Sequence, residues 1–440
     1  MMIKSVVEIS PMYEQLIYWR RDFHQYPEPA WCEYRTSSRI AAALADVGYT
    51  IKLGDQIVST SAIMGRSIDE AFEKARALRQ GADPVWLESM RITGLIAELD
   101  TGRDGPCVAL RVDLDAVRLQ ESDDSTHLPT RGGFSSQNPG CMHGCGHDGH
   151  AALGLVLGLL LAQQRDNLCG RIKLIFQPAE EGCRGGKAVA LGGELDDVDF
   201  LYAIHLGIHA ASGELVVCPE GFLSSTKFDV EFIGRAAHAG LEPNAGANAL
   251  AAACQAVSQM LAIPPHRDGM TRVNIGQLHA GVERNVIPAY ATLQGETRGA
   301  SAPLNDYVFT SVQRIVQGCA LAHGVDYQIR RQGEAIAINN SPALVHSVTL
   351  AATELGFSVI HSRPFGASDD AGFMIDRLQK QGGQAAYLVL GADLAAGHHA
   401  CSFDFDEQIL DKGLQLLASL FEQHLALATT DHAHHLASPE

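Results

Sequence analysis

The sequence predicts an α/β fold in which a helix-flanked, mainly parallel sheet is interrupted by a smaller inserted domain. From Ile92 onward, short apolar runs bounded by glycine or charged turns alternate with helical patterns, as buried strands of a helix-covered sheet do. Between about residues 224 and 335, apolar and charged residues alternate instead, which is the pattern of a strand with one buried and one solvent-exposed face. We therefore expect a discontinuous larger domain, residues 1–223 and 336–440, and an insertion at residues 224–335.

The N-terminal region is predicted to be helical. Residues 11–49 contain an amphipathic helix, a break at Tyr26–Pro29 and a second helix that ends at Gly48. The apolar face of the second helix comprises Ile40, Leu44 and Val47.

Residues 55–91 are predicted to form a helical excursion from the main sheet. Ser67 and Glu70 have the spacing of a capping box, and Gly81 supplies a C-terminal stop. The expected apolar face of this helix comprises Ile68, Phe72, Ala75 and Leu78.

The expected strands of the larger domain are residues 92–99, 107–112, 171–176, 200–204 and 385–390. In the insertion we expect, in chain order, strand 227–233, helix 246–263, strands 271–278 and 290–297, helix 303–323 and strand 326–331. This βαββαβ order is that of the ferredoxin-like unit.

Composition narrows the class of partner. Lys and Arg number 33 against 51 Asp and Glu, and the net charge of −18 disfavours binding to nucleic acid or to an anionic membrane.

The longest apolar run, residues 151–162, is too short to span a bilayer and is predicted to be a buried helix. The N-terminus lacks a signal-peptide pattern, so we expect a cytoplasmic protein, and the DHAHH tail at 431–440 is expected to be a disordered end.

The segment MHGCGHDGH at residues 142–150 gathers a thiol and three imidazoles into nine positions. In an extended segment residues two apart face the same way, so Cys145 and His147 can reach one zinc-like divalent ion. His150, one turn into the following apolar helix, is expected to support the site rather than to bind metal.

Other ligand-type residues follow predicted strands. The adjacent carboxylates of Glu180 and Glu181 suit a hydrolytic metal site, in which one carboxylate binds the metal and the other takes a proton from water. They could equally form a solvated loop. Because carboxyl ends of strands build the sites of open α/β sheets, we expect these residues to converge and to hold a pair of metal ions. The residues are Asp113, Asp115, Glu180, Glu181, His205, His398 and His399.

Together these motifs resemble the M20 metallopeptidase family, in its amidohydrolase branch of aminoacylase-like enzymes. The resemblance rests on RRDFHQYPEP near residue 20, LRVDLDA at 110–116, MHGCGHDGH, QPAEEG, GRAAHAG at 234–240, RNVIP at 284–288 and the late HHACSFDFDE. It covers nearly the whole chain.

The resemblance implies roles for individual residues. Glu180 would be the general acid/base, with Asp115 supporting the metal site from behind, and Asp113 stands where related peptidases have a metal-binding His. Of the late histidines, His399 is preferred because relatives place the ligand four residues before a Phe. The implied ligands of two divalent ions, Mn²⁺ or Zn²⁺, are Cys145, His147, Glu181, His205 and His399.

The resemblance also implies that the inserted domain serves as a dimerisation and lid domain. His238 would then help to polarise the scissile carbonyl in the partner subunit's site, and Asn285 and Arg298 would hold a substrate carboxylate. Two departures from the family pattern remove no ligand: Ala367-Ser368-Asp369-Asp370 replaces Gly-Ser-Glu-Asp, and Gly144 replaces Ala.

The main functional hypothesis is hydrolysis of an amide bond between an aromatic acyl group and an amino acid in a small-molecule substrate, with glutamate as the expected amino acid. The alternatives are an N-acyl-amino-acid or dipeptide amidohydrolase with the same mechanism, and a metal-binding scaffold or regulatory subunit. The chain is expected to act as a homodimer or with a related second subunit. A free carboxylate beside a metal ligand argues against the scaffold, since a scaffold does not need it.

Overall fold

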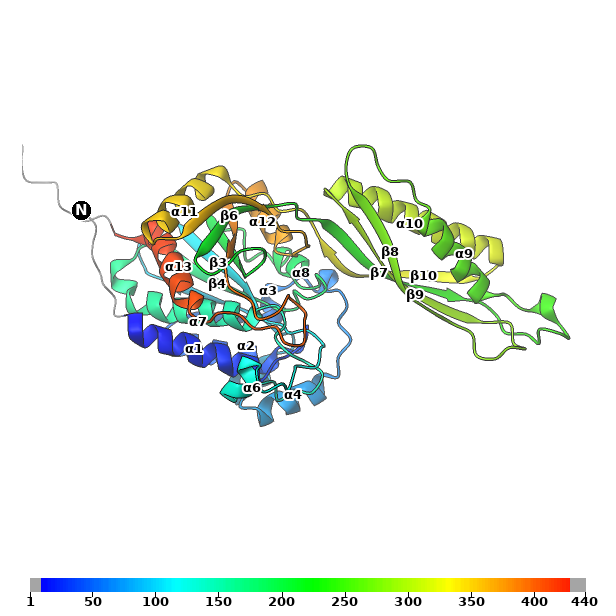
Figure 1. Ribbon diagram of the computed structural model, residues 1–440, viewed down its shortest axis with the longest axis horizontal. Coiled ribbons are helices and arrows are strands. Elements are labelled where there is room, and N and C mark those ends of the chain that lie inside the picture. Colours follow the sequence, from blue (N-terminus) through cyan, green and yellow to red (C-terminus); the bar gives the residue numbers. More distant parts are fainter. Residues whose placement is uncertain (1–8, 428–440) are drawn as a thin grey trace, which may run out of the picture.

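The computed structural model describes residues 9–427, so the predicted disordered tail lies outside the described residues. The chain forms an eight-stranded sheet and a separate four-stranded sheet (Figure 1). The strands are β1 (Thr50–Leu53), β2 (Leu95–Asp100), β3 (Cys107–Asp113), β4 (Arg171–Gln177), β5 (Phe200–Leu206), β6 (Glu214–Glu220), β7 (Ser224–Ile233), β8 (Thr271–Ala280), β9 (Tyr290–Gly299), β10 (Asp326–Ala335), β11 (Ser358–Pro364) and β12 (Gln384–Leu390).

Helices precede, separate and follow these strands. The α-helices are α1 (Ile9–Gln25), α2 (Tyr34–Asp46), α3 (Gly54–Ile57), α4 (Glu70–Arg79), α5 (Pro84–Ser89), α6 (Leu128–Gly132), α7 (His147–Gln163), α8 (Gly186–Ala190), α9 (Ala249–Leu261), α10 (Ala302–His323), α11 (Pro342–Glu354), α12 (Gly372–Lys380) and α13 (Ile409–Leu425). Short 3₁₀ turns occur at η1 (Thr60–Ala62), η2 (Arg165–Asn167) and η3 (Pro243–Ala245).

The large sheet has the strand order β1-β2-β4-β3-β5-β12-β6-β11. The neighbours β4, β3, β5 and β12 are parallel, as are β6 and β11, whereas β1, β2 and the β12–β6 contact are antiparallel. The predicted mainly parallel, helix-flanked sheet is confirmed. Its four central parallel strands end at one edge, which is where ligand-type residues were expected to converge.

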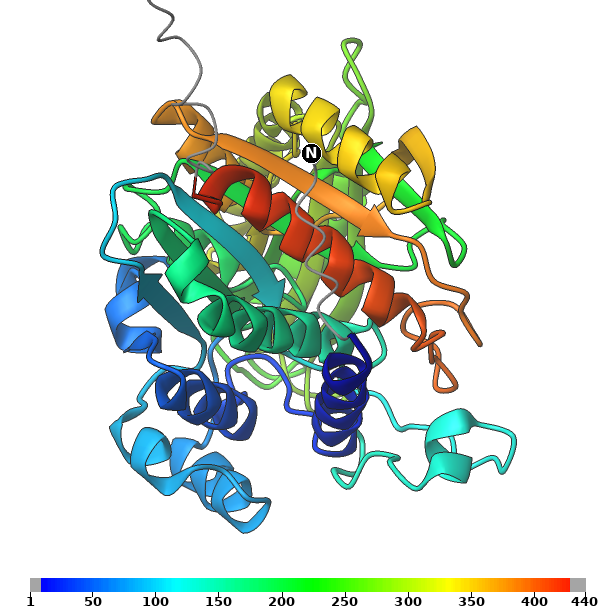
Figure 2. The ribbon, with the colours of Figure 1, turned by 90° about the vertical axis from the view of Figure 1, so that its left-hand side faces the viewer.

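Alternate residues of the central strands enter two separate cores. Along β3, Val108, Leu110 and Val112 join the core beneath α1, α7 and α13, whereas Cys107 and Ala109 join the core beneath α8 and α12. Figure 2 looks onto the first layer, with α1 in dark blue, α7 in green and α13 in red in front of the sheet. Burial on both faces explains why these strands are continuous apolar runs.

The four-stranded sheet lies between Ser224 and Ala335, with the order β10-β7-β9-β8 and antiparallel pairing throughout. This arrangement agrees with the predicted ferredoxin-like unit. On β7, Phe228, Val230 and Phe232 pack beneath α9 and α10, whereas Lys227 and Asp229 lie on the other face. The unit projects from the larger domain, to which β7 and β10 connect it (Figure 1).

The sequence missed three strands and misplaced one apolar face. β1 is only four residues long, β6 contains a proline, and β11 is a polar edge strand, so none is a continuous apolar run.

In α4 the N-cap is Asp69, whose side chain accepts a hydrogen bond from Phe72 N at 3.1 Å, and not the predicted Ser67. Phe72 and Leu78 are 59% and 54% exposed, and Ala77 is buried in their place.

The apolar run at residues 151–162 lies within α7 and is almost wholly buried, as predicted. Within residues 9–427, every helix is too short or too polar to span a bilayer. All ten cysteines are free thiols.

Candidate metal centre and active site

The MHGCGHDGH segment is a loop that turns into α7. Gly146 has φ of +91° and caps the helix, so the chain turns sharply between Cys145 and His147. The predicted extended geometry is therefore wrong, because the left-handed glycine breaks it. The helix nevertheless begins at His147 and fixes its ring in a fully buried position.

The predicted metal donors form two groups that share Cys145. In the first group the donor atoms of Cys145, His147 and His205 lie within 4.8 Å of one another, and Cys145 Sγ is 3.5 Å from His205 Nε2. The second group joins Cys145 with Glu181 and His399 within the same limit. A donor atom common to two groups suits a pair of neighbouring divalent ions.

The histidine tautomers leave the correct nitrogen free. His147 Nδ1 donates to the backbone oxygen of Asp115 at 2.8 Å, and His205 Nδ1 donates to that of Leu206 at 2.9 Å. Because a carbonyl only accepts, each ring in its neutral form carries its proton on Nδ1 and can offer the lone pair of Nε2 to a metal ion. His147 Nε2 is buried without a hydrogen-bond partner, so the residues present fit a metal ion.

Asp115 holds the two adjacent glutamates in place. Its Oδ1 accepts from Glu180 N and its Oδ2 from Glu181 N, each at 2.9 Å. Glu33, at the start of α2, accepts from Ala179 N at 2.8 Å and supports the same loop. Asp115 thus positions the backbone that directs both carboxylates, in agreement with a supporting role.

Glu180 lies beside the metal donors, with Oε2 at 3.9 Å from His147 Nε2. Burial raises its pKa well above the usual range, and the carboxylates of Asp369, Glu181 and Asp370 raise it further. A carboxyl group with a raised pKa can accept a proton from water and donate it again near neutral pH. Asp369 and Asp370 are in turn bound to the buried Arg111, at 3.3 and 3.6 Å.

His150 and Asp113 are bound to other groups. Leu206 N donates to His150 Nε2 at 2.9 Å, so its Nδ1 must donate to Asp113 Oδ1, 2.6 Å away. Asp113 also accepts from Arg111 at 2.9 Å. Both ring nitrogens of His150 are thus engaged by the protein, so neither is free for a metal ion. His398 Nε2 is 3.2 Å from the backbone oxygen of Leu206, whereas His399 Nε2 is 3.2 Å from Glu181 Oε1.

Sequence reasoning missed a buried network behind the metal-binding loop. Arg20 of α1 contacts Asp148 Oδ2 at 3.1 Å and Glu407 Oε1 at 3.0 Å. His24 Nδ1 is 2.8 Å from the same Asp148 oxygen. Arg20, His24 and Asp148 have essentially no exposed surface, and charged residues are rarely buried unless paired. The charged residues of RRDFHQYPEP hint at such pairing, but they do not identify partners that lie far along the chain.

A cavity of about 350 Å³ opens onto the metal donors. The larger domain contributes Ile208 and Phe365 as apolar walls, and the inserted unit contributes Lys227 and Arg298. Arg298 therefore lies at the cavity of its own chain, near the metal donors. Its guanidinium also donates to Glu296, at 2.9 and 3.1 Å.

His238 and Asn285 do not line this cavity. Both are exposed, and Ala239 N donates to the backbone oxygen of Asn285 at 2.9 Å, which joins their loops. The loop after β7 lies at the end of the inserted unit farthest from the large sheet (Figure 1). Within one chain, the structure does not bring these two residues to the metal donors.

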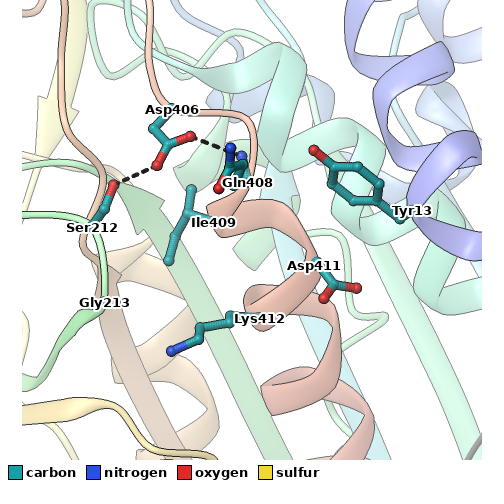
Figure 3. A pocket seen from close by; sticks show the side chains of 8 residues that line it. All are labelled: Tyr13, Ser212, Gly213, Asp406, Gln408, Ile409, Asp411 and Lys412. Carbon is teal, nitrogen blue, oxygen red and sulfur yellow. Dashed lines mark hydrogen bonds between the residues drawn. The ribbon is translucent and has the colours of Figure 1, made fainter. Parts of the chain in front are cut away.

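A larger cavity of about 720 Å³ lies elsewhere, between α1, the loop before β6 and the start of α13 (Figure 3). Its polar groups partly bind one another: Ser212 Oγ donates to Asp406 at 3.0 Å, and Gln408 N donates to the same carboxylate at 3.1 Å. It contains no predicted site residue.

A free carboxylate beside two groups of metal donors, at the carboxyl ends of parallel strands, defines a metal-dependent hydrolase. Residues 109–423 match the peptidase family M20/M25/M40. The chain belongs to this family, and the resemblance drawn from its motifs is confirmed.

Relatives and solved structures cover almost the whole chain. It is 45% identical to a subunit of p-aminobenzoyl-glutamate hydrolase from Escherichia coli, over 93% of this chain and 96% of the relative. It is 44% identical to indole-3-acetyl-aspartic acid hydrolase of Enterobacter agglomerans, with the same coverage. The crystal structure of an aminobenzoyl-glutamate utilization protein from Klebsiella pneumoniae is 37% identical, with a TM-score of 0.83 and coverage of 96% and 98%.

A Bacillus subtilis dinuclear metal-binding peptidase of the M20 family is 25% identical, with a TM-score of 0.64, over 94% of this chain and 98% of that one. These relatives and the two donor groups agree that the chain is a hydrolase that acts on amides with divalent metal ions.

Proposed function

We propose that this chain hydrolyses the amide bond between an aromatic acyl group and an acidic amino acid, and that p-aminobenzoyl-glutamate is its substrate. The observation that carries the proposal is the cavity itself, in which Lys227 and Arg298 face the metal donors alongside apolar Phe365. Two cations suit the two carboxylates of a dicarboxylic amino acid, and an apolar wall suits an aromatic ring. Two relatives above 40% identity are named for such conjugates, with glutamate and with aspartate.

The proposed cofactors are two divalent ions, Mn²⁺ or Zn²⁺. When bound, they would act as Lewis acids on the scissile carbonyl and lower the pKa of the attacking water. The proposed ligands are Cys145, His147, His205, Glu181 and His399.

Glu180 carries the proton in this proposal. Its carboxylate takes a proton from the attacking water and then gives it to the nitrogen of the leaving amino acid. Asp115 keeps Glu180 in position through the backbone of the Glu180–Glu181 pair. Arg298 and Lys227 hold the carboxylates of the substrate so that its amide lies beside Glu180.

We propose that the inserted domain, residues 224–335, makes a dimer and acts as a lid. β8 is an edge strand whose later residues are exposed, and such an edge can pair with another chain. His238 and Asn285, remote from their own cavity, would then complete the site of the partner subunit. A related second subunit could take the same place, since the Escherichia coli relative is named as one subunit of its hydrolase. The proposed location is the cytoplasm.

The proposal is tested with metal-loaded protein and three substrates: p-aminobenzoyl-glutamate, indole-3-acetyl-aspartate and an N-acetyl amino acid. We expect chelator-sensitive hydrolysis and a kcat/KM for an aryl-acyl conjugate at least tenfold above that for the N-acetyl compound. Faster hydrolysis of the N-acetyl substrate would favour the N-acyl-amino-acid alternative. Metal binding without hydrolysis of any of the three would favour the scaffold.

A further inference from the structure

A second cavity, of about 440 Å³, adjoins the metal-site cavity and shares Lys227 with it. It lies on the face of the four-stranded sheet opposite α9 and α10, where Lys227 and Asp229 project. Amide side chains of β8 and β9, those of Asn274, Gln277 and Gln294, line it. A molecule that extends past Lys227 would therefore enter a polar groove.

Arg184 reaches this groove from the loop that carries the two glutamates. Its side chain packs between two glycines, because a Cβ on Gly65 would lie 3.0 Å from its Cδ and a Cβ on Gly182 would lie 2.8 Å from its Nε. Gly65 belongs to the helical excursion, so that excursion forms one wall of the groove. Any larger residue at either glycine would displace the guanidinium.

Arg184 has no partner in the part of the chain that the structure describes. Its Nε is buried without an acceptor, and among residues 9–427 no carboxylate forms an ion pair with its guanidinium. Leaving a buried donor unsatisfied is costly. Arg184 is half-buried, so the rest of its guanidinium can reach an acceptor that enters the groove.

The two acidic residues of the groove, Asp229 and Glu296, accept hydrogen bonds from neighbouring side chains, and only Glu296 is paired with a cation. Gln332 Nε2 donates to Asp229 at 2.7 Å, and Arg298 binds Glu296. Within residues 9–427, Lys227 Nζ makes one hydrogen bond, to Cys183 Sγ at 3.7 Å, and forms no ion pair. Two cations without carboxylate partners, Arg184 and Lys227, thus lie along one path that leads away from the metal donors.

We propose that this groove is an anion subsite for a second acidic residue on the leaving group. The substrate class is an aryl-acyl acidic dipeptide: its amide bond to the aryl acid is broken by addition of water, which yields the aryl acid and the free dipeptide. Arg184 would bind the terminal carboxylate, since a guanidinium binds a carboxylate through paired hydrogen bonds. This inference rests on the proposed function.

The kinetic test compares p-aminobenzoyl-glutamate with p-aminobenzoyl-glutamyl-glutamate, in α-linked and γ-linked forms. For wild-type protein we expect kcat/KM to be higher for one of the longer substrates. In Arg184→Gln the ratio of kcat/KM, longer over shorter, should fall about tenfold, because a charge-assisted hydrogen bond is lost. Arg184→Lys should retain part of the ratio, and Arg330→Gln, an exposed arginine paired with Glu231, should leave it unchanged.

An unchanged ratio in Arg184→Gln, with normal metal content and thermal unfolding, would overturn the subsite. If the wild-type protein hydrolysed neither substrate, the proposed function would fail, and binding alone would decide the subsite. Calorimetry with the glutamyl-glutamate dipeptide and with glutamate serves that purpose. The dipeptide should bind the metal-loaded protein more tightly than glutamate, and Arg184→Gln should abolish the difference; equal binding of both by wild-type protein would reject the proposal.

Discussion

At the residue scale, Glu180 and Glu181 are sequence neighbours with opposite electrostatic surroundings. Burial and the carboxylates of Asp369, Glu181 and Asp370 raise the pKa of Glu180. Burial also acts to raise the pKa of Glu181, but its hydrogen bond to His399 and the charge of His147 lower it overall. One carboxyl group is thus suited to exchange protons and the other to remain an anionic ligand.

Glu180→Gln should therefore keep the metal ions but lose most turnover, by about 10² to 10⁴-fold, because an amide cannot accept a proton from water. Metal content by mass spectrometry and kcat are the measurements. The matched variant Glu181→Gln should instead lower metal content. A kcat close to that of the wild type in Glu180→Gln with full metal content would remove Glu180 from the proposed mechanism.

Cys145 belongs to both donor groups, so Cys145→Ala should lower metal occupancy more than the loss of a ligand from one group alone. The exposed Cys254 of the inserted unit is the control, and Cys254→Ala should retain full metal content. Equal metal content in the two variants would show that Cys145 is not a ligand.

Metal binding should weaken as pH falls. Hydrogen bonds to Cys145 and Glu181 raise the pKa of His399 to about 10, and although burial acts to lower the pKa of His147, the Asp113 carboxylate raises it overall. His399 therefore holds an extra proton at neutral pH in the metal-free protein, and the raised pKa of His147 favours its protonated form as well, so an incoming ion must displace protons. Calorimetric titrations in buffers of different ionisation enthalpy should reveal proton release; metal affinity independent of pH between about 6 and 8 would contradict this.

At the scale of elements, α1 acts as a support for the loop that begins α7. Arg20 of α1 is fully buried and contacts Asp148, Asp404 and Glu407. Asp148 follows His147 directly, so the network sets the first turn of the helix that carries a metal donor. The apolar period of α1 predicts a helix, but it does not reveal a charge cluster made by segments far apart in the chain.

Arg20→Met should reduce the free energy of unfolding by about 3 to 5 kcal/mol, because it leaves buried carboxylates without their cation. Denaturant unfolding measures the change. Arg267, whose side chain is 91% exposed beside Asp268, is the control, and Arg267→Met should change stability by less than about 0.5 kcal/mol. A loss at Arg20 no larger than at Arg267 would show that the cluster contributes little.

At the scale of the whole molecule, the inserted unit both lines the cavity and carries residues that point away from it. Arg298 and Lys227 lie at the end near the metal donors, whereas His238 lies in a loop beyond the far end of β7. One chain cannot use both ends of this unit at one site in the observed arrangement. This is the physical reason for proposing a site shared between subunits.

Mixing two inactive chains tests the shared site. If His238 acts in the partner subunit, exchange of Glu180→Gln with His238→Ala subunits should restore one intact site per heterodimer, and about half of all dimers in an equal mixture should be heterodimers. Activity would then approach roughly a quarter of the wild-type value. No recovery after verified subunit exchange would place the action of His238, if it has one, within its own chain.

The sequence by itself determined the α/β class, the ferredoxin-like insertion and a set of donor-type residues at strand ends. This was possible because the spacing of apolar residues indicates which face of a helix or strand is buried. The carboxyl ends of neighbouring parallel strands also meet at one edge of the sheet. Only the tertiary structure decided which donors share Cys145, that His150 binds Asp113 and Leu206, and that Arg298, but not His238, lines the cavity. These facts depend on contacts between segments far apart in the chain, and such contacts leave no periodic trace in the sequence.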